Sequence, residues 1–343
     1  MTAQGENILA SVQTSIGVRP SVSDVETVSL CSGTGALDLA VEQETGSRLA
    51  AYAELDPYAC QVMAVRFPDA TNLGDITAVD WTAFAASHPK VRNLVAGWPC
   101  QGISHNGHRL GLEDPRSGIW RDVVRAIAAI RPERVFLENV AAIKTRGLRV
   151  VAAHLAELGY DARWTFVTEG SVGAPHPRPR WLCSAVPGSG SSMEVPAPTS
   201  LPPVPALLPT PKASDGPNGG PNQRDGAGNY YLPAIAVRLD EQWRVPELGL
   251  DYGPAVRRWE RILGRLAPSP TSPDVRGNLR IAPEFVEWTM GYPRGWVTDL
   301  PDIPRAQQIK LGGNGVVPLQ AVSCYRHQDA YVPRQTALFG AAA

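Results

Sequence analysis

Short apolar runs alternate with helical patterns between residues 27 and 158, and this alternation constrains the fold more than any other feature of the chain. The runs are rich in residues that favour β-strands, and the segments between them space their apolar residues as helices do. This pattern predicts an α/β fold, a doubly wound, mostly parallel sheet with helices on both faces and ligands at the carboxyl ends of its strands. Expected strands cover residues 27–31, 49–54, 91–96 and 134–137, and expected helices cover residues 37–42, 56–67, 120–130 and 148–158.

Composition and charge narrow the class of protein further. With 343 residues, 43% of them hydrophobic and 19% charged, the chain is long and apolar enough to bury a core. No stretch approaches the roughly 18 consecutive apolar residues of a membrane span, and residues 1–20 lack the basic start and apolar run of a secretion signal. The five cysteines are scattered without the spacing of metal ligands. We therefore expect a soluble, cytoplasmic protein without a disulfide framework, a metal site or a membrane segment.

The texture of the sequence changes after residue 186. Residues 187–217 contain nine prolines, and regular patterns thin out as far as about residue 277. Residues 244–280 hold seven arginines against four acidic residues, although the formal net charge of the chain is -1, so a local basic surface for a polyanion is expected here. The expected organisation is a tail at 1–24, a first domain at 25–186, a loop-rich domain at 187–277 and a C-terminal segment at 278–343, with helical spacing again at 283–290 and 317–325.

The glycine turn after the first expected strand predicts a nucleotide pocket. Gly33-Thr34-Gly35 lies between a strand and a helix, where a ligand can approach the backbone closely, although by itself it is more often an ordinary tight turn. Glu54 ends the next strand 21 residues after Gly33, where such folds place a carboxylate that accepts hydrogen bonds from a ribose. Asp75-Ile76 follows in the next loop, where a carboxylate can accept from an adenine amino group. Because the full dinucleotide fingerprint is missing, the pattern favours S-adenosylmethionine over a dinucleotide.

Three further elements place reactive side chains at or near predicted strand ends. Cys100 follows the third strand and would face the cleft, although most lone cysteines are inert core residues. The segment 102–118 after it holds four glycines, a composition that suits a loop closing over a ligand. Glu138 ends another apolar strand, where burial would raise the pKa of its carboxyl group. Arg178 and Arg180 lie two residues apart on a proline-stiffened segment and so share a face, toward a ligand or toward solvent.

In their order along the chain these elements resemble the DNA (cytosine-5) methyltransferase family. The resemblance covers roughly residues 27–186 and 278–325, and the part between them corresponds to the variable region with which that family recognises its target. Each motif alone is a weak signal, but all of them occur in the family's order. The motifs are Pro99-Cys100-Gln101 with the loop 107–117, Glu138-Asn139-Val140, Arg178-x-Arg180, Met290-Gly291-Tyr292-Pro293 and Gly313-Asn314-Gly315-Val316-Val317-Pro318.

The resemblance implies roles for individual residues. Cys100 would add to C6 of a cytosine, Glu138 would hold a proton at N3, and Arg180 would bind O2. Arg178 and Gln101 complete the expected catalytic set, Gln101 by entering the space left when the base is flipped out of the duplex. S-adenosyl-L-methionine would be converted to S-adenosyl-L-homocysteine, with no metal. The residues expected to hold this cofactor are Cys31, Ser32, Gly33, Thr34, Gly35, Glu54, Leu55, Asp75, Ile76, Pro99 and Asn314.

Three positions depart from the family's pattern. Cys31 stands where the family commonly has Phe, and Leu55 stands where an aromatic residue often lies beside the adenine, so weaker stacking on the adenine is expected. His176 stands where the family usually has Gln. This changes the hydrogen bonding expected beside the two arginines, but not the arginines themselves.

The resemblance implies site-specific methylation of cytosine C5 in double-stranded DNA. The enzyme is expected to be a monomer in the cytoplasm, associated with the nucleoid or with a phage-infected host, and to serve restriction–modification or phage DNA modification. Two alternatives stay open, a relative that methylates cytosine C5 in tRNA and a catalytically silent DNA-binding relative. The presence of Cys100, Glu138 and Arg180 disfavours the silent relative. An amino-group methyltransferase is disfavoured because such enzymes have a Pro-Pro-(Tyr/Phe) element where this chain has Trp98-Pro99-Cys100-Gln101.

Overall fold

A single sheet of eight strands organises the part of the chain that the computed structural model describes, residues 24–99 and 118–331. The strands are β1 (Glu26–Leu30), β2 (Arg48–Ala53), β3 (Thr71–Asn72), β4 (Val91–Ala96), β5 (Arg134–Val140), β6 (Tyr160–Thr168), β7 (Pro179–Pro187) and β8 (Ser192–Glu194). Their order across the sheet is β3-β2-β1-β4-β5-β7-β6-β8. Neighbouring strands pair in parallel except around β7, which runs antiparallel to β5 and to β6. The mostly parallel α/β sheet predicted from the sequence is confirmed.

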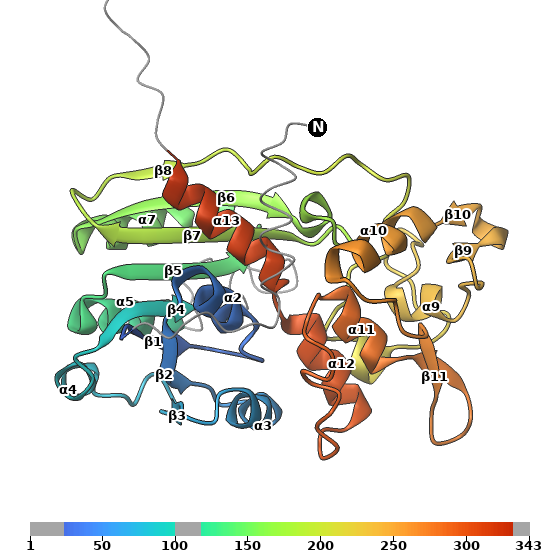
Figure 1. Cartoon of the computed structure of the whole chain (residues 1–343), viewed down its shortest axis with the longest axis horizontal. Coiled ribbons are helices and arrows are strands. Elements are labelled where there is room, and N and C mark those ends of the chain that lie inside the picture. Colours follow the sequence, from blue (N-terminus) through green and yellow to red (C-terminus); the bar gives the residue numbers. More distant parts are fainter. Residues whose placement is uncertain (1–23, 100–117, 332–343) are drawn as a thin grey trace, which may run out of the picture.

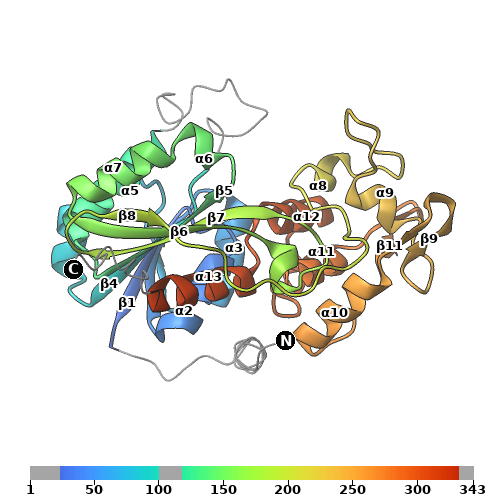
Figure 2. The ribbon, with the colours of Figure 1, turned by 90° about the horizontal axis from the view of Figure 1, so that it is seen from above.

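Helices cover both faces of the sheet (Figures 1 and 2). Alternation along β5 decides which face each side chain meets, because Val135 and Leu137 join one hydrophobic cluster and Phe136 joins the other. Both faces are therefore buried, as in other doubly wound folds. One face is covered by α2 (Ala36–Thr45), α3 (Pro57–Arg66) and α13 (Pro318–Ala330), and the other by α4 (Trp81–Ser87), α5 (Ile119–Ile130) and α7 (Leu148–Glu157), which follows the short α6 (Ile143–Arg146).

Residues 195–314, which follow β8 and are called the second region below, lie beside the sheet and share its core (Figure 1). The hydrophobic cluster that packs α2 against the sheet continues through Trp259 and Phe285 into this region. Its elements are α8 (Asp215–Asn218), α9 (Leu232–Ala236), β9 (Arg244–Val245), the 3-10 helix η4 (Pro246–Leu248), β10 (Leu250–Asp251), α10 (Gly253–Leu263), β11 (Thr271–Pro273), β12 (Leu279–Ile281), α11 (Pro283–Thr289) and α12 (Arg305–Asn314).

Several elements differ from the sequence-based expectation. The strand predicted to end at Leu137 continues to Val140, because pairing with β7 extends it beyond its most apolar residues. The region in which regular patterns thin out contains α10, whose buried Val256, Trp259 and Ile262 recur every three residues. The last turn of α12, which ends at Asn314, contains Gly312 and Gly313, poor helix formers that hide the helix in the sequence.

The predicted boundary after residue 186 stays a prediction, as do the other domain limits. The strand β8 lies beyond it and still pairs with β6 in the main sheet. Residues 1–23 of the predicted tail lie outside the described residues. Among the helices of residues 24–99 and 118–331, none is long and apolar enough to cross a membrane.

Candidate active site

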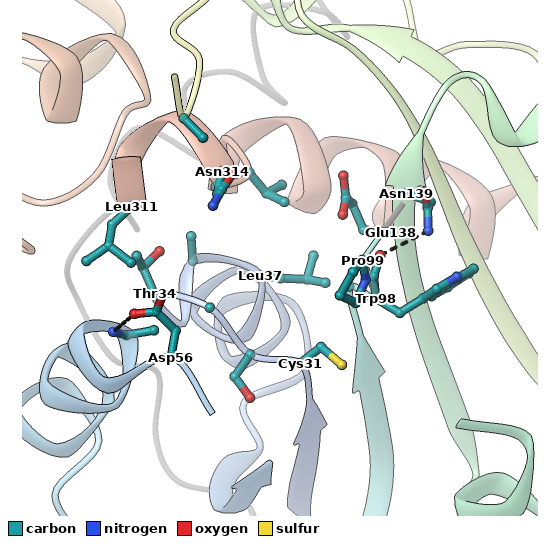
Figure 3. A pocket seen from close by; sticks show the side chains of 18 of the residues that line it. Cys31, Thr34, Leu37, Asp56, Trp98, Pro99, Glu138, Asn139, Leu311 and Asn314 are labelled. Atoms are coloured by element: carbon teal, nitrogen blue, oxygen red, sulfur yellow. Dashed lines mark hydrogen bonds between the residues drawn. The ribbon is translucent and has the colours of Figure 1, made fainter. Parts of the chain in front are cut away.

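A cavity of about 1160 Å³ opens at the carboxyl ends of the parallel strands (Figure 3). Its walls come from the loops after β1, β2, β4 and β5, from the start of β7, and from two distant segments, residues 210–214 and 310–316. Doubly wound folds bind their ligands at this edge of the sheet. The predicted site residues that line the cavity are Cys31, Ser32, Gly33, Thr34, Glu54, Leu55, Asp75, Ile76, Pro99, Glu138, Arg178, Arg180 and Asn314.

The turn after β1 is built from residues with left-handed backbone conformations. The φ angles of Cys31, Gly33 and Gly35 are 56°, 55° and 74°. A Cβ added to Gly35 would lie 2.5 Å from Phe67 and 2.7 Å from Met63, so this glycine allows α2 to pack against α3. A Cβ added to Gly33 would meet no atom within 4 Å. Gly33 thus leaves room for a ligand, whereas Gly35 is not among the residues that line the cavity and supports the turn from behind.

Glu54 ties the glycine turn to the next strand and helix. Its Oε2 accepts a hydrogen bond from the Gly33 amide at 2.8 Å, and its Oε1 accepts from the amides of Leu55 and Asp56, both at 2.8 Å. The carboxylate keeps lone pairs for further donors, such as ribose hydroxyls. Leu55 lines the cavity although 66% of it is exposed, so it offers an apolar surface at the rim.

Asp75 and Ile76 give the same cavity one acceptor and one apolar wall. The Asp75 carboxylate accepts hydrogen bonds from the amide and the hydroxyl of Thr77, at 2.9 and 2.8 Å. The bond from the Thr77 amide lowers the pKa of Asp75, which keeps this carboxyl group ionised. Ile76 is buried. Together with Glu54 and Leu55, these residues supply acceptors and apolar contacts suited to an adenosine group.

Glu138 and Arg180 form a buried ion pair where β5 meets β7. The register places Glu138 opposite Leu182, and Arg180 lies two residues from Leu182 on the same face, at the diagonal position. The Nε of Arg180 lies 2.7 Å from Oε1 of Glu138, and the two side chains are 10% and 12% exposed. Burial raises the pKa of Glu138, while the charges of Arg180 and Arg178 oppose that rise. The predicted burial and raised pKa of Glu138 are confirmed.

Arg178 joins three separate segments behind the cavity wall. It is buried like Arg180, whereas Pro179 between them is exposed, so the predicted common face of the two arginines is confirmed. Its Nη1 donates to the Pro211 carbonyl at 2.8 Å, and its Nη2 donates to the carbonyls of Gly313 and Gly315, both at 2.9 Å. Burial lowers the pKa of this guanidinium to about 10. These contacts hold the turn from which Asn314 points toward the cavity (Figure 3).

Asn139 fixes the backbone that leads toward the predicted nucleophile. Its Nδ2 donates to the Trp98 carbonyl at 3.2 Å (Figure 3). Trp98 is buried against Trp120 and Trp181, with ring centroids 4.8 and 6.2 Å away. Pro99 follows on the cavity wall, and Cys100, Gln101 and the loop 102–117 lie outside the described residues. The sequence indicated Asn139 only as part of the motif Glu138-Asn139-Val140, and its contact with Trp98 was not predicted.

Contacts between distant segments complete the cavity, and the sequence did not indicate them. The Trp296 indole donates to the Thr34 carbonyl at 2.8 Å, and the Lys310 ammonium lies 3.0 Å from an oxygen of Asp56. Residues 210–214 line the cavity and pack so tightly on α12 that a Cβ on Gly313 would lie 2.2 Å from the Lys212 carbonyl carbon. The second region therefore forms one wall of the site.

The cysteines within the described residues are all poor candidates for a nucleophile. Burial raises the pKa of the Cys31 thiol to about 12, and it also raises the pKa of Cys60. Cys183 and Cys324 are fully buried in the core, which raises the pKa of each thiol further. No group of three or more histidine, cysteine or acidic side chains that could hold a metal ion occurs within residues 24–99 and 118–331.

A comparison with known protein families identifies the family of the chain. The family described as C-5 cytosine-specific DNA methylase matches residues 25–205. The chain belongs to this family.

Individual relatives match the chain over part of their length. Type II methyltransferase M.CviJI of Paramecium bursaria Chlorella virus IL3A is 34% identical over 137 residues, which are 40% of this chain and 36% of that protein. Type II methyltransferase M.NlaX of Neisseria lactamica is 33% identical over 158 residues, 45% of this chain and 49% of that protein. The matches thus span between 36% and 49% of the length of these two relatives.

Solved structures share the fold over most of the chain. The Entamoeba histolytica methyltransferase EhMeth has a TM-score of 0.61 with 14% identity, covering 89% of this chain and 98% of its own. The Dnmt2 methyltransferase of S. pombe has a TM-score of 0.54 with 14% identity, covering 88% and 97%. At 14% identity, these similarities show that the chain shares the fold of the two methyltransferases and show nothing more specific.

Proposed function

We propose that this protein methylates C5 of cytosine in double-stranded DNA, with S-adenosyl-L-methionine as the methyl donor. The observation that carries the proposal is the buried ion pair of Glu138 and Arg180, at 2.7 Å, on the wall of the cavity that also holds the Gly33 turn. An acid and a guanidinium side by side match N3 and O2 of a cytosine ring, and the turn matches a nucleoside. Membership of the C-5 cytosine-specific DNA methylase family supports the same chemistry.

The residues of the first wall fit the methyl donor. The open space at Gly33, the acceptors Glu54 and Asp75, and the apolar surfaces of Leu55 and Ile76 suit an adenosine, and they line one cavity. When bound, S-adenosylmethionine supplies a methyl group activated for attack by a carbon nucleophile. In this proposal Ser32, Thr34, Pro99 and Asn314 complete the walls around it.

Cys100 is the nucleophile in this proposal. The chain has five cysteines, and the other four lie in positions where burial raises the pKa of the thiol. A thiol with a raised pKa yields little thiolate at neutral pH, and the thiolate is the reactive form. Cys100 comes directly after Pro99 on the cavity wall, which supports its assignment.

The chain's own groups then prepare the cytosine ring for methylation. The Cys100 sulfur forms a bond to C6, and the electrons of the C5–C6 double bond move toward C5 and N3. Glu138 holds a proton at N3 as charge develops there, and the Arg180 guanidinium donates to O2. After C5 has gained its methyl group, loss of the C5 proton restores the double bond and releases the Cys100 thiolate. The raised pKa of Glu138 suits this sharing of a proton near neutrality.

Residues 187–277 are the proposed target-recognition domain. A stacked base cannot reach the cavity, so the nucleotide must leave the duplex at an energetic cost of a few kcal/mol. Exposed arginines of this region would bind phosphates, and Gln101 would occupy the vacated space. The exposed arginines between residues 244 and 280 are Arg244, Arg257, Arg261 and Arg276. The two relatives compared above are named Type II methyltransferases, which supports a role in restriction–modification or phage DNA modification.

A trapping experiment tests this function. A duplex with 5-fluorocytosine at target sites, incubated with the protein and S-adenosylmethionine, should form a covalent adduct, since fluorine cannot leave as a proton does. Mass spectrometry of the digested adduct should place the base on Cys100, and Cys100→Ser should form none. Sites for the duplex come from bisulfite mapping of a plasmid exposed to the protein.

Two results would decide against the proposal. A folded protein that gives neither methylation nor adduct on DNA would be a silent relative, and labelling of tRNA but not duplex DNA would assign the RNA substrate. An adduct on a residue other than Cys100 would overturn the nucleophile while leaving the reaction in place.

A further inference from the structure

A fully buried histidine lies behind Arg178 and has no part in the chemistry described above. His176 has no exposed surface, and neither has Glu169, which begins the 3-10 helix η3 (Glu169–Val172) after β6. The Nδ1 atom of His176 lies 2.8 Å from Oε2 of Glu169. Its Nε2 atom lies 3.0 Å from the carbonyl oxygen of Thr289, at the end of α11. The ring therefore spans the gap between the sheet and the second region.

The two neighbours of the ring fix the number of protons in this cluster. A carbonyl oxygen and an ionised carboxylate can only accept hydrogen bonds, whereas a neutral imidazole has a single N–H. With both ring nitrogens against acceptors, a neutral His176 would leave one nitrogen lone pair facing an oxygen at close range. A favourable contact across the 2.8 Å between Nδ1 and Oε2 of Glu169 requires one further proton, on the ring or on the carboxylate. A proton on the ring would leave the carboxylate between two cations, since the Nε of Arg178 lies 3.7 Å from Oε1 of Glu169.

We propose that His176 is a doubly protonated imidazolium that, through Glu169, positions Arg178 and with it the cavity wall at Pro211 and residues 313–315. The contribution to methyl-donor binding rests on the function proposed above, whereas the protonation of His176 does not. His176 is thus a positioning residue, two steps removed from the ligand.

Competition for Arg178 is the physical basis of this role. Glu169 contacts Arg178 twice, since its carboxylate lies near the guanidinium and its backbone amide donates to the Arg178 carbonyl at 3.1 Å. The guanidinium nitrogens beyond Nε serve the carbonyls of Pro211, Gly313 and Gly315. While His176 neutralises Glu169, Arg178 stays on these carbonyls. Without the imidazolium, the buried carboxylate would draw the guanidinium toward itself and loosen the turn that carries Asn314.

The protonation state has a direct spectroscopic test in the full-length protein. With 15N-labelled histidine, the signals of His176, assigned by their loss in His176→Gln, should show a directly bonded proton on both ring nitrogens at pH 7.5. His154 is an internal control of opposite character, because its Nδ1 accepts the Trp120 indole N–H at 3.0 Å and so has no proton. A His176 signal with one unprotonated nitrogen would overturn the assignment.

The positioning role is tested by the dissociation constant for S-adenosylmethionine, measured by calorimetry. His176→Phe keeps the ring volume without hydrogen bonds, and His176→Gln keeps N–H donors without the ring. We expect affinity about tenfold weaker for His176→Phe and about threefold weaker for His176→Gln, because the amide still donates to Glu169 but does not neutralise its charge. A role in packing alone would reverse this order, and that reversal would refute the proposal.

Two further variants keep the outcomes separate. The control His154→Phe should leave the donor affinity unchanged. If His176→Phe fails to fold, the double variant His176→Phe with Glu169→Gln provides the test, since it removes the carboxylate that competes for Arg178 and its donor affinity should stay within about threefold of wild type. A double variant that binds the donor about tenfold more weakly than wild type would reject the positioning role. Absence of donor binding by the wild type would instead count against the proposed function, while the nitrogen signals would still decide the protonation of His176.

Discussion

The two walls of the cavity are built on different physical principles. Around Gly33 and Glu54, polar groups are held by backbone amides and stay partly open to solvent. Around Glu138 and Arg180, charged side chains are buried and depend on each other for stability. The first wall is local, since it uses the loops after two neighbouring strands, whereas the second requires segments from residues 169 to 315 to meet.

Because of this difference, we expect the two walls to contribute to different steps, donor binding and the chemical step. An exposed acceptor held by amides contributes a modest, uniform binding energy, since water competes for it. A buried charge pair interacts strongly with charge that develops beside it, because solvent does not screen it. Glu54 and the Gly33 turn, with the Asn314 turn that Arg178 holds, should therefore govern the affinity for the donor, whereas Glu138 and Arg180 should govern the rate of the chemical step. Three substitutions examine that contrast, and a fourth tests a pH dependence that belongs to neither wall.

Glu138→Gln should have the largest effect. The amide keeps the size of the side chain but cannot give up a proton at N3, so the turnover rate should fall by about 10²–10⁴-fold, the usual contribution of a general acid. The dissociation constant of S-adenosylmethionine should stay within about twofold of wild type. Single-turnover methylation and calorimetry measure the two quantities.

Glu133→Gln is the matched control for that substitution. Glu133 lies just before β5 and pairs with Arg92 at the surface, where its side chain is 60% exposed. Its replacement should change neither turnover nor donor affinity. If Glu138→Gln weakened donor binding as much as it slowed turnover, the division between the walls would not hold.

Arg180→Met should have the largest effect on stability. It leaves the buried Glu138 carboxylate without its partner, which typically destabilises a protein by about 3–5 kcal/mol. Urea unfolding measures the loss, and the double variant Glu138→Gln with Arg180→Met should recover much of it because no buried charge then remains unpaired. The surface pair of Arg48 and Glu26 is the comparison, since Arg48→Met should change stability by less than about 1 kcal/mol. Equal losses from the two arginines would contradict the importance of burial.

Asp38 adds a pH dependence that neither wall explains. This residue of α2 lines the cavity, is 1% exposed, and burial raises the pKa of its carboxyl group to about 7. The folded protein then binds the Asp38 proton more tightly than the unfolded chain does, so stability should fall as pH rises from about 4 to about 7 and level off above that. Between pH 5 and pH 7 the wild type should lose about 2–3 kcal/mol that Asp38→Asn does not lose. Urea unfolding at pH 5, 7 and 8 measures this difference.

Asp274→Asn is the control with the opposite sign. Hydrogen bonding from the Asn278 amide lowers the pKa of the partly exposed Asp274 to about 2. The stability that this carboxylate adds is complete above about pH 4 and is lost only as pH falls toward 2. Its replacement should therefore give the same change at pH 5 and pH 8. A wild-type curve parallel to that of Asp38→Asn would show that Asp38 does not titrate as described.

The two walls also differ in how far the sequence predicted them. Gly33, Glu54 and Asp75 were predicted from their spacing after strands, because strand ends in a parallel sheet meet at one edge whatever the rest of the chain does. Glu138 and the common face of the arginines were predicted from strand periodicity. Their partners were not, since Pro211, Gly313 and Gly315 offer backbone carbonyls that no residue type signals.

The fold divides in the same way. Strands and helices up to residue 158 follow apolar periodicity and agree with the sequence to within a few residues, apart from α4, the brief α6 and β3 and the longer β5. In the second region, glycine and proline obscure the helices α8, α9 and α12. Their positions depend on tertiary packing, such as that of α8 on α12, where a Cβ on Gly216 would lie 2.1 Å from the Ala306 carbonyl oxygen. Such contacts join segments too far apart for local patterns to report.

Glu54→Gln should give the smallest effect and completes the contrast with Glu138→Gln. Glutamine keeps one acceptor oxygen for the amides of Leu55 and Asp56 but turns an NH₂ group toward the Gly33 amide, which loses its partner. Donor affinity should weaken by about tenfold, the usual range for a lost bond to a charged acceptor, while turnover at saturating donor stays within about twofold of wild type. Calorimetry and steady-state kinetics then distinguish the roles of the two residues. The same change of acid to amide should weaken donor binding at Glu54 and slow turnover at Glu138. A fall in saturated turnover comparable to that of Glu138→Gln would mean that the glycine turn also orients the reacting groups, and the two walls would have to be treated as one unit.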